Sequence, residues 1–193
     1  MEQREESVRE RSARDAELAE LMRRYQAGDG AAFEALYARL ARPLGGFLRA
    51  LAPPGGDVED LLQTTFLQMH RARASYLPGR PVEPWVYAIA RHVALMGRRT
   101  SGRRARRETT PAEALPEVGV PPAVDGELAR LDLARFLDRL PEAGREALWL
   151  HHVVGLPFRE VAAVQGATET TAKVRAHRAL AALRALAAEE DAR

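Results

Sequence analysis

Residues 155–180 have the sequence GLPFREVAAVQGATETTAKVRAHRAL, and their spacing is that of a helix-turn-helix. A short helix is expected to begin at Phe158, and Gly166 offers the positive φ that a tight interhelical turn requires. Thr168 can then cap a longer helix through its hydroxyl. That helix has apolar residues at steps of three and four, which places them on one face: Ala172, Ala176, Ala179, Leu180, Leu183 and Leu186. The pattern predicts a helix-turn-helix from Leu140 to about Leu186.

The opposite face of the longer helix carries hydroxyls and cations, which suit contacts with DNA bases and phosphates. In the standard docking mode, the N-terminal part of this second helix enters the major groove. The candidate DNA contacts are Thr168, Thr170, Thr171, Lys173, Arg175, His177 and Arg178. The alternative is a plain helical hairpin with a solvated charged face. The order of small residue, glycine, capping threonine and cations favours DNA binding.

The first hundred residues also carry apolar residues at helical spacing. They predict one helix from Asp15 to Ala27, one after Asp29, one after Asp57 and one with Pro84 in its first turn. Pro43 and the glycines that follow it are expected to interrupt the second of these helices. No strand pattern is present, so the sequence predicts an all-α fold.

A change of composition separates two groups of helices. Residues 100–124 contain Ser, Gly, Thr and four prolines but few large apolar residues, which is typical of a flexible linker. The expected organisation is therefore a charged N-terminal tail (1–14), a helical domain (15–99), a flexible linker (100–124) and a second small helical domain with the helix-turn-helix (125–188).

Composition and charge narrow the class of protein further. The 193 residues include no cysteine, which excludes a disulfide scaffold and a thiolate metal site. No apolar run approaches the roughly 20 residues that cross a bilayer, and the charged N-terminus is unlike a secretion signal, so a cytoplasmic location is expected. From Pro84 to Arg107 there are seven arginines and no acid, which indicates a polyanionic partner there. A solvated, disordered arginine run is the alternative.

Catalysis is not expected from this sequence. Serines are scarce and none lies beside a plausible base, and a glycine-rich phosphate loop is absent. His151 and His152 are adjacent, so on a helix they point about 100° apart and do not easily share a metal. One packed and one solvated histidine is the favoured interpretation. We therefore predict no enzyme activity, no cofactor and no metal.

Longer motifs in both halves of the chain together resemble the extracytoplasmic-function (ECF) group of bacterial sigma factors. The first half has DVEDLLQTTFL (57–67) followed by YLPGRPVEPWVYAIAR (76–91). The second half has LPEAGREAL (140–148), then GLPFREVA (155–162) and TAKVRAHRA (171–179). The resemblance implies a protein that binds core RNA polymerase and promoter DNA, with the first domain on the −10 element and the second on the −35 element. It also implies an anti-sigma factor, free or membrane-bound, as a further partner.

The resemblance also suggests roles for individual residues of the first domain. The segment matching the family's polymerase-binding surface contributes Asp60, Leu61, Gln63, Phe66 and Leu67. The alternative is that Leu61 and Phe66 belong to the core and that Asp60 and Gln63 are only solvated. The residues expected at the −10 element are Tyr76, Arg80, Trp85, Arg91, His92, Arg98 and Arg99. A flipped base needs a replacement for its lost stacking. Tyr76 is the favoured partner, because Trp85 lies on the apolar face of its helix.

Four positions depart from the family pattern. His92 and Met96 stand where Asn and Asp are usual, Ala172 replaces a larger Val or Ile, and Pro157 replaces a capping Ser. Promoter preference is therefore not transferred from the family. The rival interpretation is a helix-turn-helix repressor or activator without sigma activity, which explains residues 140–186 but leaves the motifs of the first domain without a role.

Overall fold

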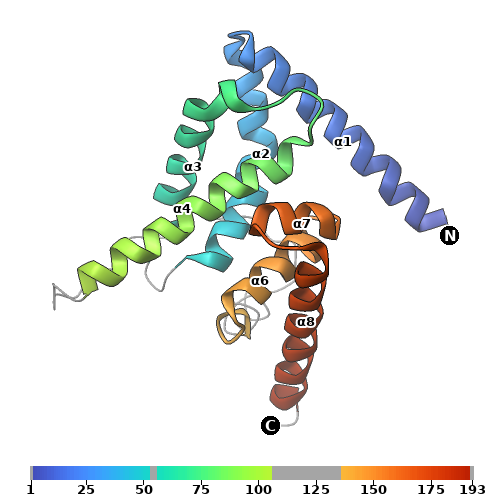
Figure 1. Ribbon diagram of the computed structural model, residues 1–193, viewed down its shortest axis with the longest axis vertical. Helices are drawn as coiled ribbons and strands as arrows, with labels where there is room; N and C mark the ends of the chain where they lie inside the picture. Colours follow the sequence, from blue (N-terminus) through green and yellow to red (C-terminus); the bar gives the residue numbers. More distant parts are fainter. Residues whose placement is uncertain (1, 53–55, 106–135, 192–193) are drawn as a thin grey trace.

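The computed structural model describes residues 2–52, 56–105 and 136–191 (Figure 1). The regular secondary structure of these residues is entirely helical, which confirms the all-α prediction. Among these residues, no helix has the length and apolar character needed to cross a membrane. The helices of the first half are α1 (Glu2–Gln26), α2 (Gly30–Leu51), α3 (Val58–Ala72), η1 (Arg73–Ser75) and α4 (Val82–Ala105). Those of the second half are α6 (Glu142–Leu148), η2 (Trp149–Val153), α7 (Phe158–Gln165) and α8 (Glu169–Asp191).

Helix α1 begins at Glu2, well before the predicted start at Asp15. The apolar residues that anchor it, from Leu18 to Tyr25, lie only in its second half, so hydrophobic periodicity could not indicate the earlier turns. The first turns are rich in Glu and Arg, which are good helix formers. The helix ends before Gly28, whose φ is 96°, and the Asp29 carboxylate accepts a hydrogen bond from the Ala32 N–H to cap α2.

Helix α2 is continuous through Pro43, so the predicted interruption is wrong. A proline inside a helix removes one backbone hydrogen bond. Burial of apolar side chains compensates for this lost hydrogen bond, because Leu40 and Leu44 on either side of Pro43 are 1% and 0% exposed. The glycine at 46 serves packing rather than helix termination, because a Cβ there would lie 3.0 Å from the Trp149 ring.

Helices α3 and α4 begin where the sequence predicts. The Asp57 carboxylate accepts hydrogen bonds from the N–H groups of Glu59 and Asp60, and Pro84 lies in the first turn of α4. Helix α4 extends to Ala105, beyond the expected domain boundary at residue 99 and into the expected linker. The rest of that linker, together with residues 125–135 of the expected second domain, lies outside the described residues.

The turn between α7 and α8 has the predicted geometry. Gly166 has φ 61° and ψ 40°, in the left-handed region, and the Thr168 hydroxyl accepts a hydrogen bond from the Thr171 N–H at 3.2 Å. Helix α8 then packs along α6, and its C-terminal end extends away from the rest of the molecule (Figure 1). The helix-turn-helix is therefore confirmed as a structure.

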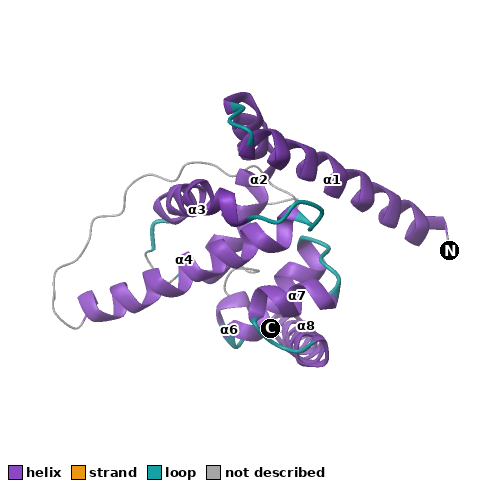
Figure 2. Cartoon of the chain, turned by 45° about the horizontal axis from the view of Figure 1, so that its top comes forward, coloured by secondary structure: helices purple, strands orange, loops and turns teal. Residues whose placement is uncertain are grey.

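The two halves of the chain pack against each other. Helix α4 lies against α7 (Figure 2). Helix α2 lies against α6 and η2. One cluster of buried side chains continues from Leu18 and Phe47 of the first half to Leu150, Leu156 and Val161 of the second. The described residues therefore form one packed body, although their helices fall into the two predicted groups.

Candidate nucleic-acid interface

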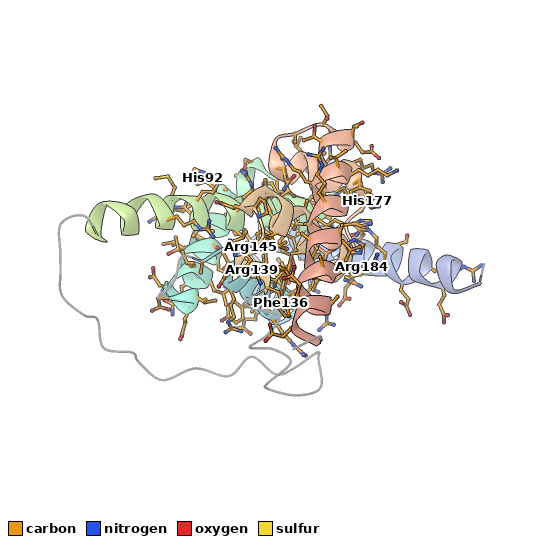
Figure 3. All side chains as sticks on the ribbon, turned by 90° about the horizontal axis from the view of Figure 1, so that it is seen from below. His92, Phe136, Arg139, Arg145, His177 and Arg184 are labelled. Atoms are coloured by element: carbon orange, nitrogen blue, oxygen red, sulfur yellow. The ribbon has the colours of Figure 1, made fainter. Side chains whose placement is uncertain are left out.

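Helix α8 has the two faces that the sequence predicts. Ala172 and Ala176 are fully buried against α6 and α7, whereas five of the proposed DNA contacts are exposed: Thr168, Thr170, Lys173, His177 and Arg178. His177 projects from this helix at some distance from His92, which lies on α4 (Figure 3). The exposed hydroxyls and cations form a continuous strip at helical spacing, as contact with a DNA groove requires.

Arg175 has a different environment from the other cations of α8. It is half-buried, and its Nη1 donates to the Gln165 side-chain oxygen at 3.0 Å. Gln165 is itself buried and donates to the Ala143 carbonyl at 2.8 Å. These bonds link α8 to α7 and α6, so Arg175 has a structural role in the arrangement described here.

Val174 is 41% exposed on the same side as Lys173 and Arg178, and the sequence analysis did not include it. An apolar side chain in this position can contact the methyl group of thymine. The signal was available, because positions 170, 173, 174, 177 and 178 share one face of a helix. A pattern of polar residues alone does not include it.

The adjacent histidines behave as expected, one packed and one solvated. The His151 ring stacks on Phe158 with a centroid distance of 3.8 Å, and its Nδ1 lies 2.8 Å from the Leu156 carbonyl oxygen. His152 is exposed over much of its surface. The part of it that is shielded from water, together with the neighbouring His151 and His177, lowers the pKa of its imidazole. No group of three or more His, Asp or Glu that could hold a metal occurs in the described part of the chain.

The two candidate aromatics of the first domain differ in exposure from the prediction. Tyr76 is only 3% exposed, and its hydroxyl donates to the Arg80 carbonyl. Trp85 is half-buried, with its ring 5.4 Å from that of Tyr76. It lines a hollow of about 380 Å³ together with Gln68, Ala72, Ala88, Ile89 and His92. The prediction that Tyr76 rather than Trp85 is available to a base is therefore wrong for this arrangement. Tyr76 is a core residue, and its ring packs against that of Trp85.

Arg91 and Arg98 are not free on the surface of α4, because both contact carboxylates of α6. Arg91 Nε lies 2.7 Å from Glu146 Oε1, as a close ion pair without the alignment of a hydrogen bond. Arg98 donates to Glu142 at 2.6 Å and to the Leu51 carbonyl at 2.6 Å. Glu146 is 2% exposed, and burial raises its pKa against the opposing charge of Arg91.

The remaining cations of this surface differ in position. Arg80 and His92 are exposed, as a DNA contact requires, and Arg80 lies in the loop that precedes α4. The side chain of Arg99 lies outside the described residues. Two of the predicted contacts are therefore available in this arrangement, and Arg91 and Arg98 would have to leave their carboxylates first.

The candidate polymerase surface on α3 consists of exposed and buried residues. Asp60, Gln63 and Leu67 are exposed, with Leu67 at 48%, whereas Leu61 and Phe66 are 8% and 5% exposed and belong to the core. The sequence analysis missed one neighbour of this surface: Tyr37 of α2 is 46% exposed and its ring lies 4.6 Å from that of Phe66.

Comparison with known proteins gives this arrangement a context. The family model for sigma-70 region 2 matches residues 36–104, and that for sigma-70 region 4 matches residues 130–183. The chain is 39% identical over 171 residues to RNA polymerase sigma factor CarQ of Myxococcus xanthus, covering 87% of this chain and 96% of that one. It is 35% identical to ECF RNA polymerase sigma factor SigF of Caulobacter vibrioides, covering 88% and 93%.

Two solved structures have a similar fold. CnrH in complex with the cytosolic domain of CnrY has a TM-score of 0.68 and 27% identity, covering 90% of this chain and 98% of that one. The sigma factor RpoE of Bartonella quintana, in complex with the anti-sigma factor NepR, has a TM-score of 0.68 and 26% identity, covering 80% and 95%. The family models match more than half of this chain, and the matches to CarQ and SigF cover nearly the full length of each relative. The chain therefore belongs to the ECF group of sigma factors, which bind core RNA polymerase and direct it to the −10 and −35 elements of promoters.

Proposed function

We propose that α8 recognises the −35 element, that the hollow beside Trp85 on α4 holds part of the −10 element, and that the exposed side of α3 binds core polymerase. In this assignment residues 15–99 and 125–188 act as two functional domains. The observation that carries the proposal is the presence, in one chain, of a recognition helix with exposed cations and of a separate aromatic-lined hollow beside exposed His92.

Trp85 is the proposed stacking partner for a base of the separated −10 strand. Its ring borders an apolar hollow and has the buried Tyr76 ring behind it, so it is held in place for stacking. Stacking on an aromatic side chain contributes about 1–3 kcal/mol per base. Trp85→Ala should therefore weaken binding of a fork-junction −10 DNA by the polymerase holoenzyme about 5- to 150-fold, as measured by fluorescence anisotropy. Tyr76→Phe, which keeps the buried ring, should change this affinity little.

The exposed cations of α8 are the proposed phosphate and base contacts at the −35 element. Each phosphate contact adds about 0.9 to the slope of log affinity against log salt. Lys173→Ala and Arg178→Ala should each reduce transcription from a −35-dependent promoter and lower this slope. Ala181→Ser, at an exposed position further along α8, is the matched control. If both cation variants matched wild-type reporter output, the assignment of the recognition surface would be wrong.

The α3 surface, with Tyr37 beside it, is the proposed contact with core polymerase. It combines carboxylate, amide and apolar groups, which is the mixed character of protein interfaces. Gln63→Ala and Leu67→Ala should weaken binding of core polymerase without changing thermal stability, because both side chains are exposed. Arg49→Ala, at an exposed position in the last turn of α2, provides a control for surface substitution in general.

Recognition of both promoter elements requires the two halves to separate. The −10 and −35 positions are about 25 base pairs apart, which is about 85 Å of duplex. In the arrangement described here α4 packs directly on α7, and the two halves share one core. By its length alone, the chain from 106 to 135 could extend about 100 Å. We therefore propose that the packed arrangement is a resting form and that promoter binding uses an open one.

A resting form of this kind suits control by an anti-sigma factor. Both similar structures are complexes, one with the anti-sigma factor NepR and the other with the cytosolic domain of CnrY. We propose an anti-sigma partner for this chain as well, either free or with its binding domain on the cytosolic side of a membrane. We also propose a cytoplasmic location, because polymerase and promoters are there, and no catalytic role for the chain itself, because the polymerase performs the chemistry.

Run-off transcription with purified core polymerase tests the proposed function directly. The full chain added to core polymerase should produce transcripts of defined length from a cognate genomic fragment, and neither component alone should do so. A repressor or activator without sigma activity would instead bind duplex DNA tightly without polymerase and would never support initiation.

A further inference from the structure

The early turns of α1 bridge the two halves of the molecule. We propose that residues 2–14, here called the N-terminal extension, act as an intramolecular latch that holds the helix-turn-helix against α1 and α4. The latch consists of Arg11 with Gly155 and Glu160, and Arg14 with Glu83. Its effect on transcription rests on the proposed function, because only a factor that must open to bind a promoter is restrained by it.

Arg11 makes the closest contacts of the latch. Its Nη1 donates to the Gly155 carbonyl at 2.5 Å, and its Nη2 donates to Glu160 Oε2 at 2.6 Å. Both acceptors lie at the beginning of the helix-turn-helix: Gly155 has φ 85° in the turn before α7, and Glu160 is in the first turn of that helix. Within α1, Arg11 Nε also lies 3.6 Å from Asp15 Oδ2, which helps to hold the guanidinium in place. One guanidinium thus joins α1 to two adjacent groups of the second half.

Arg14 extends the latch to α4. Its Nη1 lies 3.7 Å from Glu83 Oε1, and the Glu83 side chain is only 4% exposed. The other Glu83 oxygen, Oε2, has no hydrogen-bond partner among the described residues. Glu83 and Glu160 are both largely removed from water, and the positive charges of Arg11 and Arg14 offset part of the cost of burying them. The extension therefore supplies the counter-charges for carboxylates from both halves.

The latch depends on ion pairs rather than on apolar packing. A cavity of about 650 Å³ lies beside it, and its lining includes Ala13, Arg14, Leu40, Glu83 and Val153. Val153 is 60% exposed, so this part of the second half is not sealed against α1. Release of these charged contacts beside an open cavity exposes little apolar surface by itself, which is what a reversible latch needs. Separation of the halves must in addition expose the apolar side chains of the core that they share.

The latch and the ion pairs of α4 restrain the same movement. Arg91 and Arg98 hold α6 against α4, while Arg11 holds the start of α7 against α1. Separation of the halves must break all of these contacts. Loss of Arg11 alone therefore raises the fraction of open molecules without removing a residue assigned to DNA or polymerase.

The test uses the full chain, with one spin label in each half. Because the sequence has no cysteine, Glu34→Cys on α2 and Ala181→Cys on α8 give two unique labelling sites at exposed positions. Double electron–electron resonance then gives the distance distribution between the halves. Arg11→Ala is the test variant, and Arg9→Ala, at an exposed arginine of the same helix, is the matched control.

Arg11→Ala is expected to enlarge the long-distance population, and Arg9→Ala to leave the wild-type distribution unchanged. At limiting concentration, the apparent affinity for core polymerase on promoter DNA should rise about three- to tenfold in Arg11→Ala, because it scales with the fraction of competent molecules. Arg11→Glu should open the molecule further by repelling Glu160. Adding Glu160→Arg should restore the short distance. Thermal melting of each variant checks that it is folded.

An Arg11→Ala distance distribution equal to that of the wild type would overturn the latch, as would a wild-type chain that is already open. Failure of the charge-swapped pair to close again, with both proteins folded, would also overturn it. These outcomes are distinct from a failure of the proposed function. If the proposed function were wrong, neither the wild type nor any variant would support run-off transcription. The spin-label distances would still report whether Arg11 holds the halves together.

Discussion

At the scale of single residues, the contact between Gly46 and Trp149 shows how one missing side chain joins the two halves. Gly46 lies inside α2, where glycine is usually unfavourable, but a Cβ at this position would lie 3.0 Å from the Trp149 ring. Its neighbour Gly45 is different, because a Cβ there would meet nothing within 4 Å. The sequence alone could not separate these two glycines, since their roles depend on a residue about a hundred positions away.

Gly46→Ala should therefore destabilise the protein by about 1–3 kcal/mol, the usual cost of overpacking. Gly45→Ala is the matched control, and it should stabilise by about 0.5–1 kcal/mol, because alanine favours a helix over glycine. Urea denaturation followed by circular dichroism measures both. Equal effects of the two substitutions would contradict the Trp149 contact.

Glu83 is a second residue whose behaviour follows from burial. Glu83 is 3% exposed, and this burial raises the pKa of its carboxyl. The positive charges of Arg14 and Arg11 lower this pKa in part, whereas the negative charges of Asp15 and Glu160 raise it further. Relative to the unfolded chain, folding therefore shifts the Glu83 equilibrium toward the protonated carboxyl. The associated stability is fully present below the ordinary pKa of 4.5 and is lost as the pH rises through the raised value.

Glu83→Gln mimics the protonated acid at every pH, so its stability relative to wild type should depend on pH in a defined direction. The variant should be the more stable protein at pH 8, and the difference should shrink as the pH falls toward 4.5. Urea midpoints across this range provide the measurement. A wild-type protein more stable than the variant at pH 8 would show instead that the ion pair with Arg14 outweighs the cost of burial.

At the scale of elements, the turn between α7 and α8 is the part that the sequence specifies most completely. Gly166 in the left-handed region and Thr168 as a helix cap are both local requirements, and both are met. Helices α1 and α2 show the opposite case. The charged turns of α1 have no apolar period, and α2 continues through Pro43 because the leucines around it are buried by other helices.

Gly166→Ala places a Cβ in the left-handed conformation and should destabilise the helix-turn-helix by about 1–2 kcal/mol. Gly166→Asn should cost less, because asparagine adopts this conformation more readily. Either side chain has room at position 166, since a Cβ there meets nothing within 4 Å. Thermal unfolding distinguishes the variants, and equal losses would indicate that conformational strain is not the cause.

At the scale of the whole molecule, the two halves share one buried core instead of having two separate ones. The chain contains two tryptophans, and each half has one: Trp85 in α4 and Trp149 in η2. Each can therefore report on the unfolding of its own half. Shared burial predicts cooperative unfolding, whereas independent domains on a tether would unfold separately.

Single-tryptophan variants test this cooperativity. In Trp149→Phe, the fluorescence of Trp85 should change at the same urea concentration as the circular dichroism of the whole chain. In Trp85→Phe, the fluorescence of Trp149 should do the same. Comparing two signals within each variant removes the effect of the substitution on stability itself. Fluorescence and circular dichroism midpoints that differ in either variant would show that the halves unfold independently.

The candidate site was predictable where it depends on helical period and was not where it depends on packing between elements. The two faces of α8 follow from the spacing of its alanines and cations, because a helix imposes its period on every side chain. Tyr76 and Trp85 could not be ranked in this way. Their exposure depends on how the loop before α4 folds, including the bond between the Tyr76 hydroxyl and the Arg80 carbonyl.

The sequence by itself determined the helical class, the helix-turn-helix and the family resemblance, because caps, left-handed glycines and apolar periods act over a few neighbouring residues. Only the tertiary structure decided that Arg91 and Arg98 are paired with α6, and that Arg11 reaches the start of α7. The partners in these ion pairs lie between 44 and 149 positions apart in the chain. No local pattern encodes such a pairing, since it exists only once the two halves are packed together.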